Sequence, residues 1–287
     1  MKIFYVPQQS CAEAASYSPS AGKPALVVAD WLKHGLITPD DIVAFEPLQD
    51  AVIGKAHDPR FVDGVLHSRI TNGFGNTSEA VANSLLYTSG SLLAATEYAL
   101  EHQTHTCSPT SGFHHAGYDF SEGFCTFNGL MVTAVALKSA GYAKSIGILD
   151  CDFHLGNGTE DIIKRQEIDY VTHFTQGAVF RSKDDVGKLA HKYFDWLKNA
   201  IGEMQDCDVI LYQAGADPHE HDPLGGLLTT DQMQERDMMV FTGFKDQPLA
   251  WNLAGGYQRD AQGTIEPVLE LHRNTVAACL KYSHSFG

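Results

Sequence analysis

Short apolar runs alternate along the chain with longer segments of helical periodicity. The apolar runs cover residues 2–6, 145–152, 208–217 and 249–256. Runs of this length, apolar at most positions, are typical of strands buried on both faces of a parallel sheet. The segments with apolar residues every three or four positions are residues 24–35, 78–102, 128–141, 185–204 and 265–282. They predict amphipathic helices, and Gly35 and Gly141 are placed to end two of them.

The alternation of strands and helices predicts an α/β fold. We expect residues 1–287 to form a single domain, with a mostly parallel sheet sandwiched between helices. In such sheets ligands bind beyond the carboxyl ends of the strands. The polar residues that follow the apolar runs are therefore the first candidates for a functional site.

Composition narrows the class of protein. The formal charge of −15 disfavours binding to nucleic acid or to an anionic membrane surface, and the apolar start is too short for a signal peptide or a membrane span. The six cysteines include no C-x-x-C pair, which argues against a thiolate zinc cluster and fits reduced thiols. We therefore expect a soluble, intracellular protein, most simply a cytoplasmic one.

Acidic residues and a histidine follow two of the predicted strands. Asp150, Asp152 and His154 alternate at the end of one run, and Asp217 follows another. Because residues two apart on an extended chain point to the same side, Asp152 and His154 can converge on one ion. An aspartate after a strand, taken alone, is more often a helix cap. Taken together, these residues favour a divalent metal held by three ligands with one position open, which is typical of catalytic zinc.

Two further segments carry groups suited to proton transfer. His114 and His115 are adjacent in "GFHHAGYDF", and they can face one site only if the backbone there is irregular. The paired glycines of "LAGGY" free Tyr257 to project into the crevice, where its hydroxyl could donate to an oxyanion. Each motif also has an ordinary structural explanation by itself. The two histidines could be adjacent by chance, and Tyr257 could follow a simple surface turn.

Four motifs in order resemble the histone deacetylase family and its bacterial amidohydrolase relatives. They are "SGFHHAGYDFSEGFCTFNG", "LDCDFHLGNGT", "AGADPHEHDPLGG" and "LAGGY". The segments around residues 56 and 88 are also similar, so the resemblance extends over about residues 18–257. It implies an arginase-like fold and zinc-dependent hydrolysis of an acylated amine by a metal-bound water.

The resemblance also implies roles for individual residues. Asp152, His154 and Asp217 would hold one Zn²⁺, and a structural K⁺ would lie near Asp150 and the main chain of residues 152 and 154. His115 would be the general base and acid, and His114, paired with Asp150, a second proton-handling group. Tyr257 would donate to the carbonyl oxygen. Gly123 would accept the substrate N–H through its backbone, and Phe124 would form one wall of a channel for an aliphatic chain.

The chain departs from the family pattern at several positions. Leu155 replaces a frequent second histidine, and Asn157 stands where some members carry an aspartate, so an amide would orient His115. Small residues near the channel rim are replaced by His219, Glu220 and His221. The segment at 173–182 matches only loosely, and from it Phe180 is predicted to form the opposite channel wall.

Alternatives remain open at the level of function. Manganese ureohydrolases of the same fold need a D-x-H-x-D run, and Gly156 at its last position favours a single metal. A non-enzymatic metal-binding or acyl-lysine-binding protein would not need His115 or Tyr257. Leu224, where a glutamate would select polyamines, favours an acetyl-lysine-like substrate, whereas Glu220 and the acidic composition keep acetylpolyamines as the alternative. The sequence leaves a homo-oligomer open.

Overall fold

The computed structural model describes residues 1–11, 18–181 and 189–282. One seven-stranded sheet runs through this part of the chain, in the order β2-β1-β3-β7-β6-β4-β5, and every pairing in it is parallel. The strands are β1 (Lys2–Phe4), β2 (Ile42–Val43), β3 (His105–Ser108), β4 (Ile146–Asp150), β5 (Val171–Thr175), β6 (Val209–Gln213) and β7 (Leu249–Asn252). The predicted parallel α/β architecture is confirmed.

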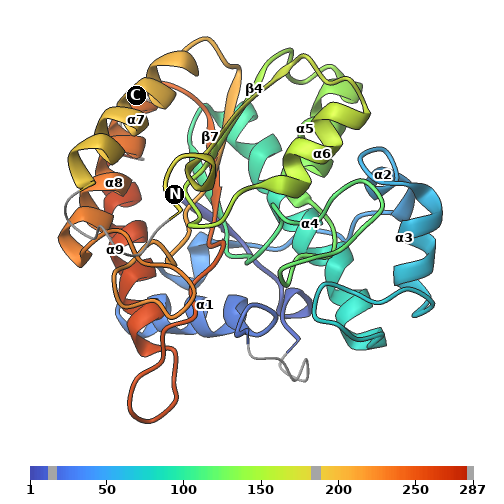
Figure 1. Ribbon diagram of the computed structural model, residues 1–287, viewed down its shortest axis with the longest axis horizontal. Helices are drawn as coiled ribbons and strands as arrows, with labels where there is room; N and C mark the ends of the chain where they lie inside the picture. The colour runs from blue at the N-terminus through green and yellow to red at the C-terminus, as the bar shows by residue number, and fades with distance from the viewer. Residues whose placement is uncertain (12–17, 182–188, 283–287) are drawn as a thin grey trace.

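Helices cover both faces of the sheet (Figure 1). On one face lie α1 (Lys23–Lys33), α7 (Ala190–Glu203), α8 (Thr230–Gly243) and α9 (Glu266–Tyr282). On the other lie α2 (Asp50–Ile53), α3 (Pro59–Leu66), α4 (Glu79–His102), α5 (Gly129–Ala140) and α6 (Asn157–Arg165). Short 3-10 turns occupy Pro7–Gln9, Pro39–Asp41 and Gln176–Ala178. None of the helices in the described ranges is long and apolar enough to cross a membrane.

The central strands are apolar throughout because they pack on two cores. In β6, Ile210 and Tyr212 contribute to one hydrophobic cluster, whereas Val209 and Leu211 contribute to the other. This alternation is the result of successive side chains pointing to opposite faces of the sheet. All four side chains are fully buried. The uninterrupted apolar pattern that predicted this strand therefore reflects helices on both sides.

Several elements differ from the sequence prediction. The strands β2, β3 and β5 and the helices α2, α3, α6 and α8 were not among the predicted segments. Two of these strands were not predicted because they contain polar residues. β3 has the sequence HTCS and β5 has the sequence VTHFT, so neither forms an apolar run. The helix expected over residues 185–204 begins at Ala190, and its first part lies outside the described residues.

The sheet changes character at the carboxyl ends of its strands. The strand register places Ser108, Asn252, Gln213, Asp150 and Thr175 side by side, as the last residues of β3, β7, β6, β4 and β5. All five side chains are buried and polar. Because parallel strands end at the same edge, one row of the sheet becomes the polar floor of a site.

Candidate active site

Three predicted ligands converge just beyond this polar row. The oxygens of Asp152 and Asp217 and a ring nitrogen of His154 all lie within 4.8 Å of one another. His154 Nδ1 is 3.1 Å from Asp152 Oδ1 and 3.0 Å from Asp217 Oδ2. This is the one group of three or more such side chains in the described part of the chain that could hold a metal ion.

Backbone amides hold both carboxylates in place. Gly255 N–H donates to Asp152 Oδ2 at 2.8 Å, and Phe153 N–H donates to Asp217 Oδ1 at 3.1 Å. Gly255 is packed so closely that a Cβ atom there would lie 2.4 Å from Asp217 Oδ2 and 2.7 Å from Asp152 Oδ2. The loop after β7 thus fixes candidate ligands that follow β4 and β6.

The electrostatics of this cluster favour a bound cation. Burial alone would lower the pKa of His154, but Asp152 and Asp217 raise it to about 11. Burial and the neighbouring Asp152 carboxylate raise the pKa of Asp217 to about 7. For Asp152, burial acts in the raising direction, but His114 and His154 hold its pKa well below the ordinary value. Two buried carboxylates thus draw a positive charge onto the one imidazole between them, and a divalent ion fits this oxygen and nitrogen donor set.

The two adjacent histidines face the same site because the backbone before them is unusual. Gly112 and Phe113 have φ values of +94° and +97°. The rings of His114 and His115 consequently lie with their centroids 4.1 Å apart, and the His115 ring is 5.8 Å from that of His154. The irregular backbone that the histidine pair requires is therefore present.

Different partners give the two histidines different charges. His114 Nδ1 is 2.8 Å from Asp150 Oδ2. Burial alone would lower the pKa of His114, but Asp150 and Asp152 raise it to about 9. His115 Nδ1 is 2.5 Å from Asn157 Oδ1, and burial together with the charge on His114 lowers the pKa of His115 to about 4. At neutral pH one imidazole is cationic and its neighbour is neutral, the pairing expected of an electrostatic stabiliser beside a base.

Tyr257 is held close to the ligands by the loop that follows β7. Ala254 and Gly256 have φ values of +51° and +140°, and Tyr257 N–H donates to Asp222 Oδ2 at 2.7 Å. The side chain is 8% exposed. Burial, reinforced by Asp152 and Asp217, raises the pKa of its phenol well above the ordinary value. The hydroxyl therefore stays protonated and able to donate.

The residues predicted to line the channel lie in different surroundings. Phe124, with φ +64° and preceded by Gly123 at +55°, has its ring centroid 5.8 Å from that of Tyr257. Leu224 is 36% exposed. Phe180, in contrast, packs in the hydrophobic core against Tyr193, with 5.6 Å between ring centroids. Phe180 follows the 3-10 turn Gln176–Ala178 and is 5% exposed. This placement speaks against the channel wall that we expected and favours a packing role for Phe180.

The three substituted rim residues also separate. His219 is 7% exposed, and its ring nitrogens lie 3.1 Å from Gln258 Oε1 and 3.0 Å from Thr230 Oγ1. Its ring is 5.3 Å from that of His221, which is exposed. His219 therefore braces the loop, while Glu220 is half-buried beside it.

Three residues near the site were given no role by the sequence reasoning. Lys23 is fully buried and donates through Nζ to Ala254 O at 2.8 Å. Glu122 Oε2 accepts from Asn157 Nδ2 at 3.0 Å. His173 is half-buried near Asp150, and a Cβ atom added at Gly156 would lie 2.8 Å from Asp150 Oδ2 and 3.2 Å from the His173 ring. The one feature of the sequence that could have drawn attention to Lys23 is its position at the start of an apolar helix. Glu122 lies inside the motif SGFHHAGYDFSEGFCTFNG, where nothing in the pattern indicated a role for it.

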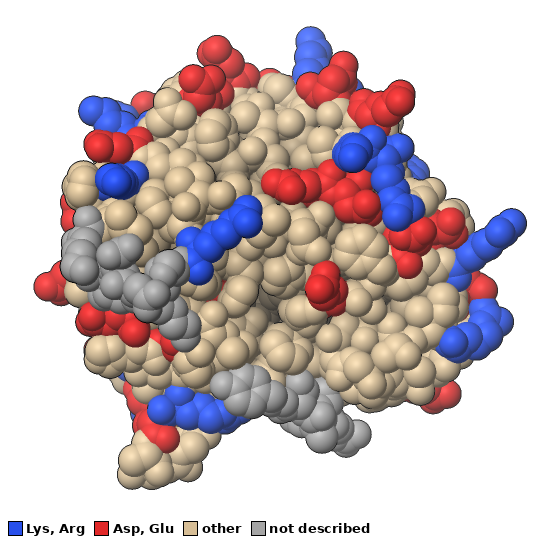
Figure 2. Space-filling model, viewed as in Figure 1, with Lys and Arg blue, Asp and Glu red and all other residues tan. Residues whose placement is uncertain are grey.

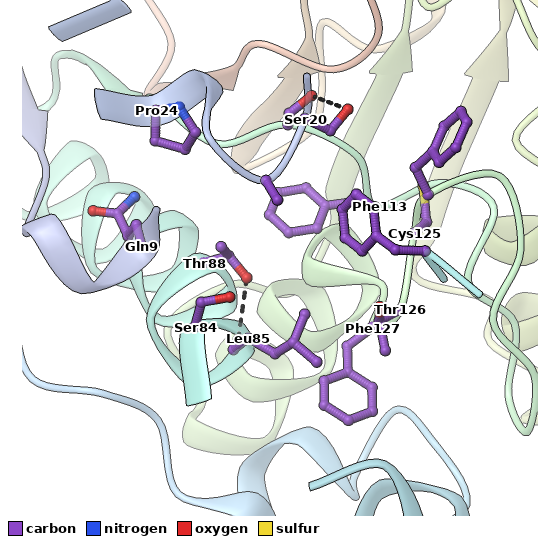
Figure 3. A pocket seen from close by; sticks show the side chains of 14 residues that line it. Gln9, Ser20, Pro24, Ser84, Leu85, Thr88, Phe113, Cys125, Thr126 and Phe127 are labelled. Carbon is purple, nitrogen blue, oxygen red and sulfur yellow. Dashed lines mark hydrogen bonds between the residues drawn. The ribbon is translucent and has the colours of Figure 1, made fainter. Parts of the chain in front are cut away.

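Phe124 is also among the residues that line a small cavity next to the site, which Figure 3 shows from close by. It holds about 30 Å³, and its lining includes phenylalanines, hydroxyl side chains and Gln9. The Gln9 amide nitrogen is buried without a hydrogen-bond partner among the described residues. A cavity of this size has room for about two water molecules.

The outer face shown in Figure 2 is hollowed near its middle, with an acidic group beside the hollow. Acidic side chains also gather on one side of this face (Figure 2). This distribution agrees with the formal charge of −15. It would favour the approach of a positively charged molecule over an anionic one.

The fold and the site define a class of protein, the deacetylases and amidohydrolases built on the arginase and deacetylase fold. A model of the histone deacetylase domain matches residues 20–192, and the chain belongs to the histone deacetylase family. The resemblance seen in the sequence is confirmed.

Individual relatives agree with this assignment. An uncharacterized protein of Picosynechococcus sp. is 26% identical over 268 residues, which cover 84% of this chain and 87% of that protein. The acetylpolyamine amidohydrolase of Mycoplana ramosa is 52% identical over 56 residues, covering 20% of this chain and 16% of the enzyme. The solved structure of an acetylpolyamine aminohydrolase from Burkholderia pseudomallei shares the fold, with a TM-score of 0.75 at 18% identity over 97% of this chain and 98% of that one.

Proposed function

We propose that this chain is a zinc-dependent deacetylase that hydrolyses the amide of an acetyl-lysine-like substrate, releasing a short acid and a free amine. We propose further that residues 1–287 form one catalytic domain. The observation that carries the proposal is the convergence of the Asp152, His154 and Asp217 donor set with a neutral and a cationic histidine. A protein that only bound metal would need neither histidine.

The donor set would hold one Zn²⁺, which when bound polarises the amide carbonyl and lowers the pKa of a water molecule it binds. The neutral imidazole of His115 accepts the proton of the attacking water and later delivers it to the leaving amine. His114, held cationic by Asp150, stabilises the negative charge that develops beside it. Tyr257 donates its hydroxyl proton in a hydrogen bond to the carbonyl oxygen as that oxygen becomes an anion.

The channel residues would position the substrate. Phe124 packs against the aliphatic part of the amine, and the Gly123 carbonyl accepts the amide N–H. The positive φ values at both residues turn this loop toward the site. Val179, which is 56% exposed two residues after Gly177, is a better candidate than Phe180 for the opposite side, because Gly177 packs directly against the His154 backbone. The K⁺ near Asp150 stays a prediction.

Acetylpolyamines are the second candidate substrate. The local identity to an acetylpolyamine amidohydrolase and the acidic surface support this alternative. Leu224, an apolar side chain at an exposed position, supports the acetyl-lysine substrate instead. Both reactions need the same catalytic groups, so the difference lies in how the free end of the amine is bound.

A direct comparison tests the proposal. One zinc-loaded preparation is offered acetyl-lysine peptides, longer acyl-lysines and acetylated polyamines, and kcat/KM is measured for each, with the chelator-treated protein as control. We expect the highest kcat/KM with acetyl-lysine peptides and loss of turnover without metal. A preference for polyamines would select the alternative. Absence of hydrolysis with all three, at full zinc occupancy, would refute the proposed function.

A further inference from the structure

A third residue stands behind His115 and Asn157. Asn157 Oδ1 is 2.5 Å from His115 Nδ1, and on its other side Asn157 Nδ2 donates to Glu122 Oε2 at 3.0 Å. The side chains form a continuous line from an exposed carboxylate to the histidine beside the metal ligands. Glu122 itself is exposed and touches neither the ligand set nor a ring nitrogen of either histidine in these contacts.

The order of donors and acceptors along this line is determined from its outer end. An ionised carboxylate can only accept hydrogen bonds, so Glu122 must face the NH₂ side of the Asn157 amide. The oxygen side then faces His115, and an oxygen accepts only if Nδ1 carries a proton. In a neutral imidazole, a proton on Nδ1 leaves the Nε2 lone pair free to act as a base.

We propose that Glu122 is a positioning residue that fixes the orientation of the Asn157 amide and, through it, the tautomer of His115. This inference rests on the proposed function, because it takes His115 as the general base. Without Glu122 the amide can rotate by half a turn. Its NH₂ group would then face Nδ1 and favour the tautomer in which Nε2 carries the proton and cannot accept another.

The surrounding backbone leaves amide rotation as the main freedom. The first turn of α6 is tied to the histidine pair, since Gly158 N–H and Thr159 N–H both donate to His114 O, at 2.9 and 3.1 Å. A Cβ at Gly158 would lie 2.4 Å from the Ala116 backbone, so this contact is close.

The carboxylate side of the pair is anchored as well. Glu122 N–H donates to Cys125 O at 3.1 Å, and Cys125 N–H donates to Glu122 O at 2.8 Å. Both side chains therefore start from fixed backbone positions. The two orientations of the Asn157 amide occupy the same space, and Glu122 selects one of them.

The polarity of the line can be reversed, and this gives a test. In Glu122→Gln the side chain can present either oxygen or NH₂, so the amide of Asn157 is no longer oriented. In Asn157→Asp two carboxylates face each other. In the double variant, the amide introduced at position 122 can donate, and the carboxylate introduced at position 157 accepts from both sides. The proton on His115 Nδ1 is thereby restored.

The experiment measures the His115 tautomer and the kinetics in four proteins: wild type, Glu122→Gln, Asn157→Asp and the double variant. Glu160→Gln is the control. Glu160 is an exposed glutamate near the start of α6, so its substitution removes the same charge without touching the line. The His115 ring nitrogens are followed by NMR in zinc-loaded protein labelled with ¹⁵N-histidine, and assigned by their loss in His115→Ala. Values of kcat and KM are measured on the best acylated amine.

We expect wild type and Glu160→Gln to hold the Nδ1–H tautomer, and Glu122→Gln to show a shifted tautomer population. We expect kcat to fall about 10- to 100-fold in Glu122→Gln, the usual scale for residues that orient a functional group, with KM changed by no more than about twofold. The double variant should recover at least about 10-fold in kcat over Glu122→Gln, a coupling that independent sites would not show.

An unchanged tautomer and unchanged kcat in Glu122→Gln would overturn the proposal, and so would a double variant no better than the product of its singles. If wild type hydrolyses no acylated amine, the proposed function fails, but the tautomer in Glu122→Gln still decides the role of Glu122. The two inferences are thus refuted by different results.

Discussion

Lys23 offers a quantitative test of the electrostatics around the site. Its side chain is fully buried, and its ammonium donates to Ala254 O, in the loop that leads to Tyr257. Burial lowers the pKa of Lys23 from 10.5 to about 8, against the attraction of Asp217, Asp152 and Asp222. The protein therefore holds a charged lysine where the charged form is disfavoured.

The sign of the effect follows from proton binding. Between pH 8 and 10.5 the unfolded chain binds more protons at this lysine than the folded chain does, so the free energy of unfolding rises with pH across that window. Below pH 8 Lys23 is protonated in the folded state too, so the folded protein carries the full destabilisation from burying this charge. The difference in pKa corresponds to roughly 3 kcal/mol.

We therefore predict that Lys23→Met stabilises the metal-free protein at pH 7. The variant loses one hydrogen bond to Ala254 O, which contributes about 1 to 2 kcal/mol. That carbonyl keeps the Ser111 hydroxyl as a donor. The net gain should be about 1 to 2 kcal/mol at pH 7 and should disappear, or change sign, by about pH 10.

Urea unfolding in the presence of a chelator, at pH 7 and at pH 10, measures this difference directly. Lys33→Met is the matched control, since Lys33 is exposed in the last turn of the same helix. Titrating groups away from Lys23 are common to wild type and variant, so their contributions to the difference cancel. A difference between Lys23→Met and wild type that is independent of pH would show that burial does not depress this pKa, and would refute the reasoning.

Three further predictions concern catalysis and metal binding. Tyr257→Phe should keep zinc and most substrate affinity while kcat falls by about 10² to 10³; an unchanged kcat at equal zinc content would make Tyr257 structural. His115→Ala should lower kcat by at least about 10², and normal turnover in it, with His114→Ala inactive, would exchange the two roles. Gly255→Ala should weaken zinc binding by about 10- to 100-fold in a chelator competition, because its Cβ would press on both ligand carboxylates. Gly202→Ala, where the Cβ meets no atom within 4 Å, is its control; equal zinc affinity in both variants would contradict the packing argument.

Residues that directly follow strands were predictable, because the sheet itself brings them together. Asp150 ends β4, and Asp152 and His154 follow within four residues, while Asp217 comes four residues after β6. The parallel register aligns these strand ends at one edge. The apolar runs in the sequence therefore indicated where the three candidate metal ligands would meet, even though periodicity alone could not assign roles to His114 and His115.

Phe180 lies too far beyond its strand for its position to be predicted in this way. It follows β5 by five residues, and the 3-10 turn Gln176–Ala178 lies between them, so the alternation of side chains along the strand does not predict which way its ring points. A turn of this kind leaves no hydrophobic periodicity in the sequence. The ring packs on Tyr193 and Trp196 of α7 instead, a helix whose position relative to β5 is a property of the whole fold.

Glu122 and Lys23 were missed for the opposite reason, since each is recognised by a partner far away in the sequence. Glu122 contacts Asn157, 35 residues later, and Lys23 contacts Ala254, 231 residues later. A charged residue in a loop or at a helix start usually faces solvent, so its type gives no reason to expect either contact. Both residues contact segments that the sequence motifs had singled out, Asn157 beside His115 and the loop that leads to Tyr257. The sequence motifs thus mark the atoms that would touch substrate, whereas the residues that hold those atoms in one protonation state or position become visible only when the chain is folded.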